Sequence, residues 1–183
     1  MVQISRFLAL ASLIATGFTM PAKGTLAQLE ADIATTLSEL TSLYNQIDDF
    51  PQTGLYGARK IDASVKQFIP TLNKCTADIK TLPLPISEAD GNAILTSLEP
   101  LQAPIFGALT DIIDKKAGFA ALPVPGFPAI ILQDLKNLNV SVPAFWIELI
   151  SVMPDDLKSP TQDILAEIVI LYNNSIDAYE DCD

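Results

Sequence analysis

The chain has 183 residues, enough for one domain with a substantial core, and its 22 acidic and 11 basic residues give a net charge of −11. A surface this acidic repels nucleic acid and anionic membranes, so neither is an expected partner. The chain contains no histidine, which excludes catalysis by a histidine-based triad or dyad and any metal site that needs imidazole.

Residues 1–22 are predicted to be a signal peptide. Arg6 is the basic element, residues 7–18 are uncharged and largely apolar, and small residues precede Ala22. The apolar stretch is shorter than the roughly 20 residues that cross a bilayer. A longer uncharged run at 117–132 is cut by three prolines. We therefore expect no membrane span, and a single helical domain over residues 23–183 that is secreted and either extracellular or associated with the cell wall.

The first two helices are indicated by apolar residues that recur at spacings of three and four. One such stripe covers residues 26–47 and starts behind a plausible capping box of Thr25 and Gln28. A second stripe covers residues 61–82 and contains Pro70, which predicts a bend or break.

A third helix is predicted to begin at Ser87, which forms a capping signature with Asp90. Its stripe over residues 94–116 keeps phase through Pro100 and Pro104. This continuity favours one kinked helix over two short ones.

The following connection, residues 118–128, must be irregular because of its prolines, yet it is strongly apolar. Either it folds back over the end of the bundle, or it forms an exposed or mobile lid that contacts a hydrophobic surface or admits lipid. The candidate surface-contact residues are Phe119, Leu122, Val124 and Phe127.

Two further helices complete the pattern. One starts near Pro128, extends to residue 152 and contains Pro143; the last opens at Ser159-Pro160 with Gln162 as capping-box residue. Short connections between long helices predict an all-α fold, an up-and-down bundle of about five long, proline-kinked helices.

The apolar stripes have two possible meanings. Each is the core face of an amphipathic helix, or the prolines prevent uniform packing and leave an elongated cavity that an acyl chain could fill. The candidate cavity residues are Ile33, Leu37, Leu40, Val65, Phe68, Leu98, Leu101, Leu109, Ile112, Phe145, Leu149, Ile164, Ile168 and Leu171. Trp146 is either a core aromatic or a contact residue.

Familiar catalytic motifs are absent from the sequence, which has no Gly-rich phosphate loop, CxxC, HExxH or GxSxG. The acidic pairs at 48–49 and 155–156 stand at predicted helix ends, where solvated turn residues are expected. A hydroxyl nucleophile would need a base, and Lys74 or Lys80 would have to serve. We therefore expect no enzyme, and no catalytic, cofactor-binding or metal-binding residue.

Two kinds of modification fit an exported chain. Cys75 and Cys182 are a candidate disulfide in an oxidising compartment, the alternative being one buried thiol and one free thiol. Asn139 and Asn173 begin N-glycosylation sequons.

Several ordered segments resemble a known family. The run Ser87-Glu88-Ala89-Asp90-Gly91-Asn92-Ala93-Ile94-Leu95, with Leu98 and Asp114-Lys115-Lys116 after it, is similar to the middle of the fungal hydrophobic surface binding protein A family. Asp134-Leu135-Lys136-Asn137-Leu138 and the turn at Pro154 resemble it as well. The family includes cell-wall galactomannoproteins.

The resemblance implies a function that the residues alone do not give. It implies a secreted, non-enzymatic helical protein that adsorbs to hydrophobic surfaces, with recruitment of a secreted hydrolase as a further expectation. The alternative that it implies is an extracellular carrier that binds a fatty acid or similar lipid in an apolar cavity between helices.

Overall fold

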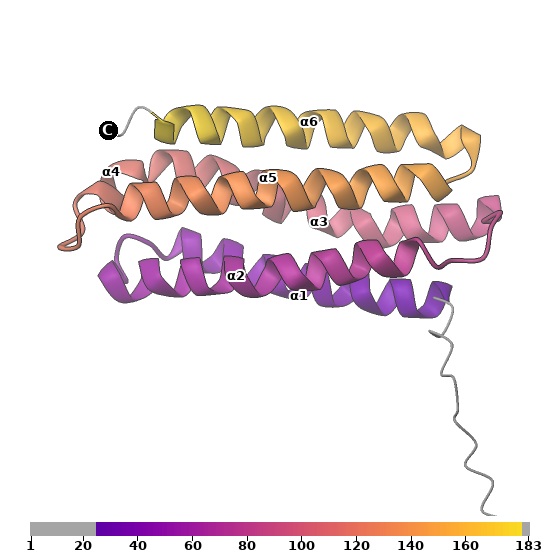
Figure 1. Ribbon diagram of the computed structural model, residues 1–183, viewed down its shortest axis with the longest axis horizontal. Coiled ribbons are helices and arrows are strands. Elements are labelled where there is room, and N and C mark those ends of the chain that lie inside the picture. Colours follow the sequence, from indigo (N-terminus) through magenta and orange to yellow (C-terminus); the bar gives the residue numbers. More distant parts are fainter. Residues whose placement is uncertain (1–24, 181–183) are drawn as a thin grey trace, which may run out of the picture.

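The structure, a computed structural model, describes residues 25–180 and is all-helical over that range (Figure 1). Its helices are α1 (Leu26–Asp48), α2 (Gly54–Ile79), α3 (Glu88–Asp114), α4 (Lys116–Ala120), α5 (Phe127–Val152) and α6 (Asp155–Glu180). The all-α class is confirmed, and the described residues contain no strand. The predicted leader, residues 1–22, lies outside the described range.

Helix starts follow the capping chemistry of the sequence. The backbone N–H of Gln28 donates to Thr25 Oγ1 at 3.1 Å, and that of Asp90 donates to Ser87 Oγ at 3.1 Å. Each bond satisfies a backbone donor that the first helical turn leaves without a partner. The predicted starts of α1 and α3 are confirmed. Helix α3 is also one continuous helix despite Pro100 and Pro104.

Three boundaries differ from the expectation. Helix α2 begins at Gly54, ahead of the predicted stripe, and α6 begins at Asp155 rather than at Ser159. The acidic residues in the first turn of α6 suit the positive end of the helix dipole, and Leu157 packs against the core. These interactions favour a helix that begins before the apparent cap at Ser159-Pro160. The connection after α3 is not wholly irregular, because it contains α4; residues 25–180 thus form six helices, five long ones and the short α4, where five were predicted.

The five long helices form a closed ring. Around the ring the order is α1, α2, α5, α6, α3 and back to α1. Successive long helices alternate in direction along the chain, as expected for an up-and-down bundle (Figure 1). The pairs α1–α2 and α5–α6 are antiparallel neighbours, but α2 packs beside α5 and α3 beside α1 and α6. Each helix therefore turns one face toward a shared centre.

One end of the ring is closed by α4, which packs against α3 and α5. The ring of Phe119 stacks on Phe50 with centroids 4.0 Å apart, and the centroid of Phe127 lies 6.2 Å from that of Phe119. Gly118 allows this approach, because a Cβ there would lie 3.0 Å from Phe50 Cε1. This aromatic cluster of Phe50, Phe119 and Phe127 is the most closely stacked part of the core.

Two adjacent lysines tie helix ends together beside the cluster. Lys115 Nζ donates to the carbonyls of Ile47 and Asp48 at 2.7 and 2.6 Å, which are the last carbonyls of α1. Lys116 Nζ donates to the carbonyl of Ala178 near the end of α6. Cations suit the C-terminal end of a helix, where carbonyls lack partners.

Candidate functional site

The centre of the ring contains two adjoining apolar voids, which together we call the inner cavity. The larger void has a volume of about 40 Å³ and is lined by residues from all five long helices. The smaller has a volume of about 20 Å³ and shares four lining residues with the larger one. The shared residues are Leu40, Phe68, Ile105 and Tyr172.

The inner cavity is elongated along the bundle. On α5 its lining extends from Ile131 to Trp146, which at 1.5 Å per residue is roughly 22 Å of helix. The side chains that line it are almost all apolar. Such a space is too apolar to hold ordered water over most of its length.

The predicted cavity residues divide into two groups. Those that line the inner cavity are Leu40, Val65, Phe68, Leu101, Leu109, Ile112 and Phe145. Those that pack elsewhere in or against the core are Ile33, Leu37, Leu98, Leu149, Ile164, Ile168 and Leu171. The two groups differ in the direction of the side chain around the helix axis and in its position along the bundle, and the sequence spacing of apolar residues does not determine either.

Of the lining residues that were not predicted, Trp146, Tyr172 and Asp134 give the cavity its character. Trp146 is 1% exposed and lines the smaller void, so its core interpretation is confirmed and its indole also faces the cavity. Tyr172 lies between the two voids. Asp134 lines the larger void. Its position could have been found, because Asp134 stands three residues after Ile131 and four before Leu138, inside the apolar stripe.

Asp134 is the charged residue of the cavity wall. Its side chain is 5% exposed, and its Oδ2 atom accepts no hydrogen bond from a donor group of the described residues. Burial raises the pKa of Asp134 to about 7; repulsion by Asp62 on α2 and a hydrogen bond to the same carboxyl act in the same direction, while Lys66 opposes them. Near neutral pH this carboxyl therefore exchanges between its acid and ionised forms.

The apolar connection does not present its phenylalanines to solvent. Phe119 is fully buried and Phe127 is 3% exposed, whereas Leu122 and Val124 are half-buried. Folding back over the end of the bundle is thus the arrangement found, with α4 as its core. Contact of Leu122 and Val124 with a surface stays a prediction.

The sites expected for modification lie apart from the cavity. Cys75 is a free, buried thiol four residues before the end of α2, and burial raises its pKa to about 12. Cys182 lies outside the described residues. The disulfide between Cys75 and Cys182 therefore stays a prediction.

The two sequon asparagines lie on helices. Asn173 is exposed on α6, and Asn139 is half-buried on α5. Their glycosylation stays a prediction.

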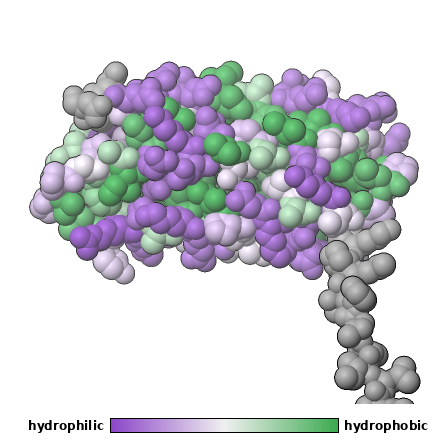
Figure 2. Space-filling model, viewed as in Figure 1, coloured by the Kyte–Doolittle hydropathy of each residue, from purple (hydrophilic) through white to green (hydrophobic). Residues whose placement is uncertain are grey.

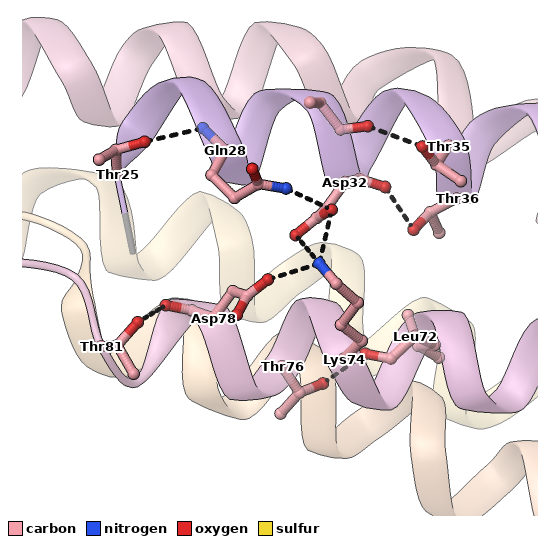
Figure 3. A network of polar contacts seen from close by, with 11 residues as sticks. Thr25, Gln28, Asp32, Thr35, Thr36, Leu72, Lys74, Thr76, Asp78 and Thr81 are labelled. Atoms are coloured by element: carbon pink, nitrogen blue, oxygen red, sulfur yellow. Dashed lines mark hydrogen bonds and ion pairs between the residues drawn. The ribbon is translucent and has the colours of Figure 1, made fainter. Parts of the chain in front are cut away.

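Lys74, one of the two lysines considered as catalytic bases, forms ion pairs with acidic residues. Figure 3 shows Lys74 between Asp32 and Asp78, with Nζ 2.9 and 2.8 Å from their carboxylates; Gln28 also donates to Asp32 at 3.0 Å. Hydrogen bonds to Asp78 and Asp32 raise the pKa of Lys74, so this amine is held in its charged form. The network joins α1 to α2. Within residues 25–180 no cluster of side chains suits a metal ion.

A second apolar feature lies on the outside. A groove of about 270 Å³ is lined by Phe106 on α3 and by Glu167, Ile170 and Leu171 on α6; we call it the outer groove. Ile170 is 59% exposed. On the face seen in Figure 2, apolar and hydrophilic residues are interspersed. None of the helices within the described range combines the length and hydropathy needed to cross a bilayer.

Comparison with known proteins gives concordant matches. A family described as "Hydrophobic surface binding protein A" matches residues 26–150. Cell wall mannoprotein 1 of Aspergillus fumigatus is 24% identical over 161 residues, which are 88% of this chain and 52% of that protein. The chain thus spans about half the length of this relative.

Two solved structures share the fold. Afmp4p in complex with palmitic acid has a TM-score of 0.77 at 21% identity, over 85% of this chain and 99% of that one. Ligand binding domain 1 of the Penicillium marneffei MP1 protein, complexed with arachidonic acids, has a TM-score of 0.75 at 14% identity, with the same coverage.

Proposed function

Because the chain belongs to the hydrophobic surface binding protein A family, we propose that it is a non-enzymatic protein that binds a long-chain lipid in its inner cavity. One observation carries the proposal: an elongated apolar void is lined by side chains from all five long helices. Solved structures of the same fold hold palmitic and arachidonic acids. The cell-wall name of its relative supports a secreted or wall-associated location.

The size of the void sets a condition on binding. Volumes of about 40 and 20 Å³ are far below the roughly 300 Å³ of the smallest common ligand pockets. An acyl chain therefore enters only if the helices move apart. The ring permits this, because each long helix packs mainly against two neighbours and no central helix fills the middle. Apolar burial of the ligand supplies about 25 cal/mol per Å² removed from water.

Native mass spectrometry tests the proposal. The delipidated chain is mixed with palmitic acid, and we expect a bound species with one or more acids that survives dilution. A chain that keeps its apo mass at every palmitate concentration would end the carrier function.

Adsorption to hydrophobic surfaces is a second function, favoured by the outer groove. Phe106, Ile170 and Leu171 expose apolar surface beside a single acidic residue, Glu167. We expect wax or polyester particles to deplete the protein from solution, and I170E to weaken depletion. V140E, at a residue 72% exposed on α5, is the matched control. Equal depletion of both variants would remove the groove from this function. Recruitment of a hydrolase stays a prediction.

A further inference from the structure

The wall of the inner cavity holds a buried carboxyl whose hydrogen-bond contact is with a second acid. Asp134, on the inner face of α5, contacts the carboxyl of Asp62, and its Oδ2 accepts no hydrogen bond from a donor group of the described residues. Leaving a buried acceptor unpaired is unfavourable, so such an atom marks a place where a ligand group could bind.

A line of charged side chains connects this atom with the surface. Asp62 on α2 is half-buried, and its Oδ1 lies 2.6 Å from Nζ of the exposed Lys66. These two residues are the charged groups whose fields act on Asp134; Tyr172 is the titratable neighbour from α6 in the same void. Asp134 thus stands at the inner end of a polar seam between α2 and α5.

We propose that Asp134 is the head-group site of the inner cavity, and that it selects acyl ligands with an uncharged, hydrogen-bond-donating end, such as a long-chain alcohol, over ligands with an ionised carboxylate. This inference rests on the proposed lipid binding. A hydroxyl donates to Oδ2 and satisfies it. An ionised carboxylate offers no donor, and two like charges in an apolar cavity repel each other strongly.

The selection depends on pH in a defined direction. A fatty acid binds at Asp134 only when one of the two carboxyl groups holds a proton. Since the pKa of Asp134 is about 7, fatty-acid binding weakens as the pH rises through neutrality, while alcohol binding loses less.

The chain carries its own reporter for the test. Trp146 is its one tryptophan, and it lines the smaller void. Bromine atoms on an acyl chain quench tryptophan fluorescence on contact, so brominated stearic acid and brominated stearyl alcohol report occupancy directly. Binding of both probes is measured at pH 5 and pH 8 for the unmodified chain, for D134N and for the control D163N, an exposed acid on α6.

The expected results separate selection from binding itself. At pH 8 the unmodified chain and D163N should bind the alcohol about tenfold more tightly than the acid. The factor arises because pH 8 is about one unit above the pKa of Asp134, and one unit corresponds to a tenfold cost of protonation. D134N loses this preference and the pH dependence of acid binding. An unmodified chain that binds both probes equally at both pH values overturns the selection while leaving lipid binding intact. Absence of quenching by either probe overturns both.

Discussion

The end of the bundle closed by α4 and the middle of the ring are packed in opposite ways. At the closed end, Phe50 and Phe119 stack at 4.0 Å, and a Cβ at position 118 would lie only 3.0 Å from Phe50 Cε1. In the middle, five helices surround voids and the buried carboxyl of Asp134. The phenylalanines of the apolar connection are thus fully packed against the core, whereas the interior of the ring contains unfilled space. The aromatic cluster is thus a packed part of the core, and the middle of the ring is the part where we propose that lipid binds.

The largest expected effect comes from the closed end. F119A removes a fully buried ring from the aromatic cluster and should lower the free energy of unfolding by about 3 to 5 kcal/mol. Urea unfolding measures this, with L122A at a half-buried neighbour as the milder control. A loss no greater than that of L122A would mean that this end is not the tightly packed region.

The next effect comes from the middle of the ring, where a substitution is expected to raise the free energy of unfolding and not to lower it. Since burial holds the pKa of Asp134 near 7, the folded chain keeps a proton that the unfolded chain releases above about pH 4. Stability should therefore fall as the pH rises from about 4 to 7 and then level off.

D134N removes that slope. Above pH 7 the variant should be more stable than the unmodified chain, by on the order of 3 kcal/mol, and near pH 4 the two should agree. Unfolding curves at pH 4, 6 and 8 decide this. A variant with an unchanged pH slope would show that Asp134 is hydrated in the folded protein.

A smaller loss is expected at the lysine that caps α1. K115M leaves the carbonyls of Ile47 and Asp48 without their donor and should cost about 1 to 3 kcal/mol. K80M is the control, since Lys80 is 60% exposed and lies 3.7 Å from Glu148. Equal melting temperatures for the two variants would contradict a capping role.

The smallest effect on stability should accompany the largest effect on binding. Ala108 lines the larger void, so A108L fills existing space and should change the free energy of unfolding by less than about 1.5 kcal/mol. Palmitate uptake, followed by native mass spectrometry, should drop. The exposed A63L on α2 is the control. Undiminished uptake by A108L would place the ligand elsewhere.

Local sequence signals predicted the helices well, because caps and three-four spacing act within one turn. Thr25 and Ser87 cap as expected, and α3 passes through its prolines. The order of helices around the ring was not predictable in this way. Placement of α2 beside α5 depends on contacts between residues far apart in sequence.

The site was only partly predictable for the same reason. Periodicity identifies an inner face but not the height at which facing side chains leave a gap. Phe68 therefore lines the cavity, whereas Leu171 lines the outer groove. Asp134 was visible in the apolar stripe, but an acid among aliphatic residues gives no sign that a second acid, Asp62 on α2, lies beside it.

The adjacent lysines at the start of α4 also fix how the helices can move. One dipeptide holds the ends of α1 and α6 through Lys115 and Lys116, while its backbone continues directly from α3. Sliding any of these three helices by one residue shifts it about 1.5 Å along its axis, enough to break bonds of 2.6 to 2.7 Å. The two lysines therefore oppose sliding of these helices at this end, and we expect the opening that lipid binding requires to occur by tilting about this end.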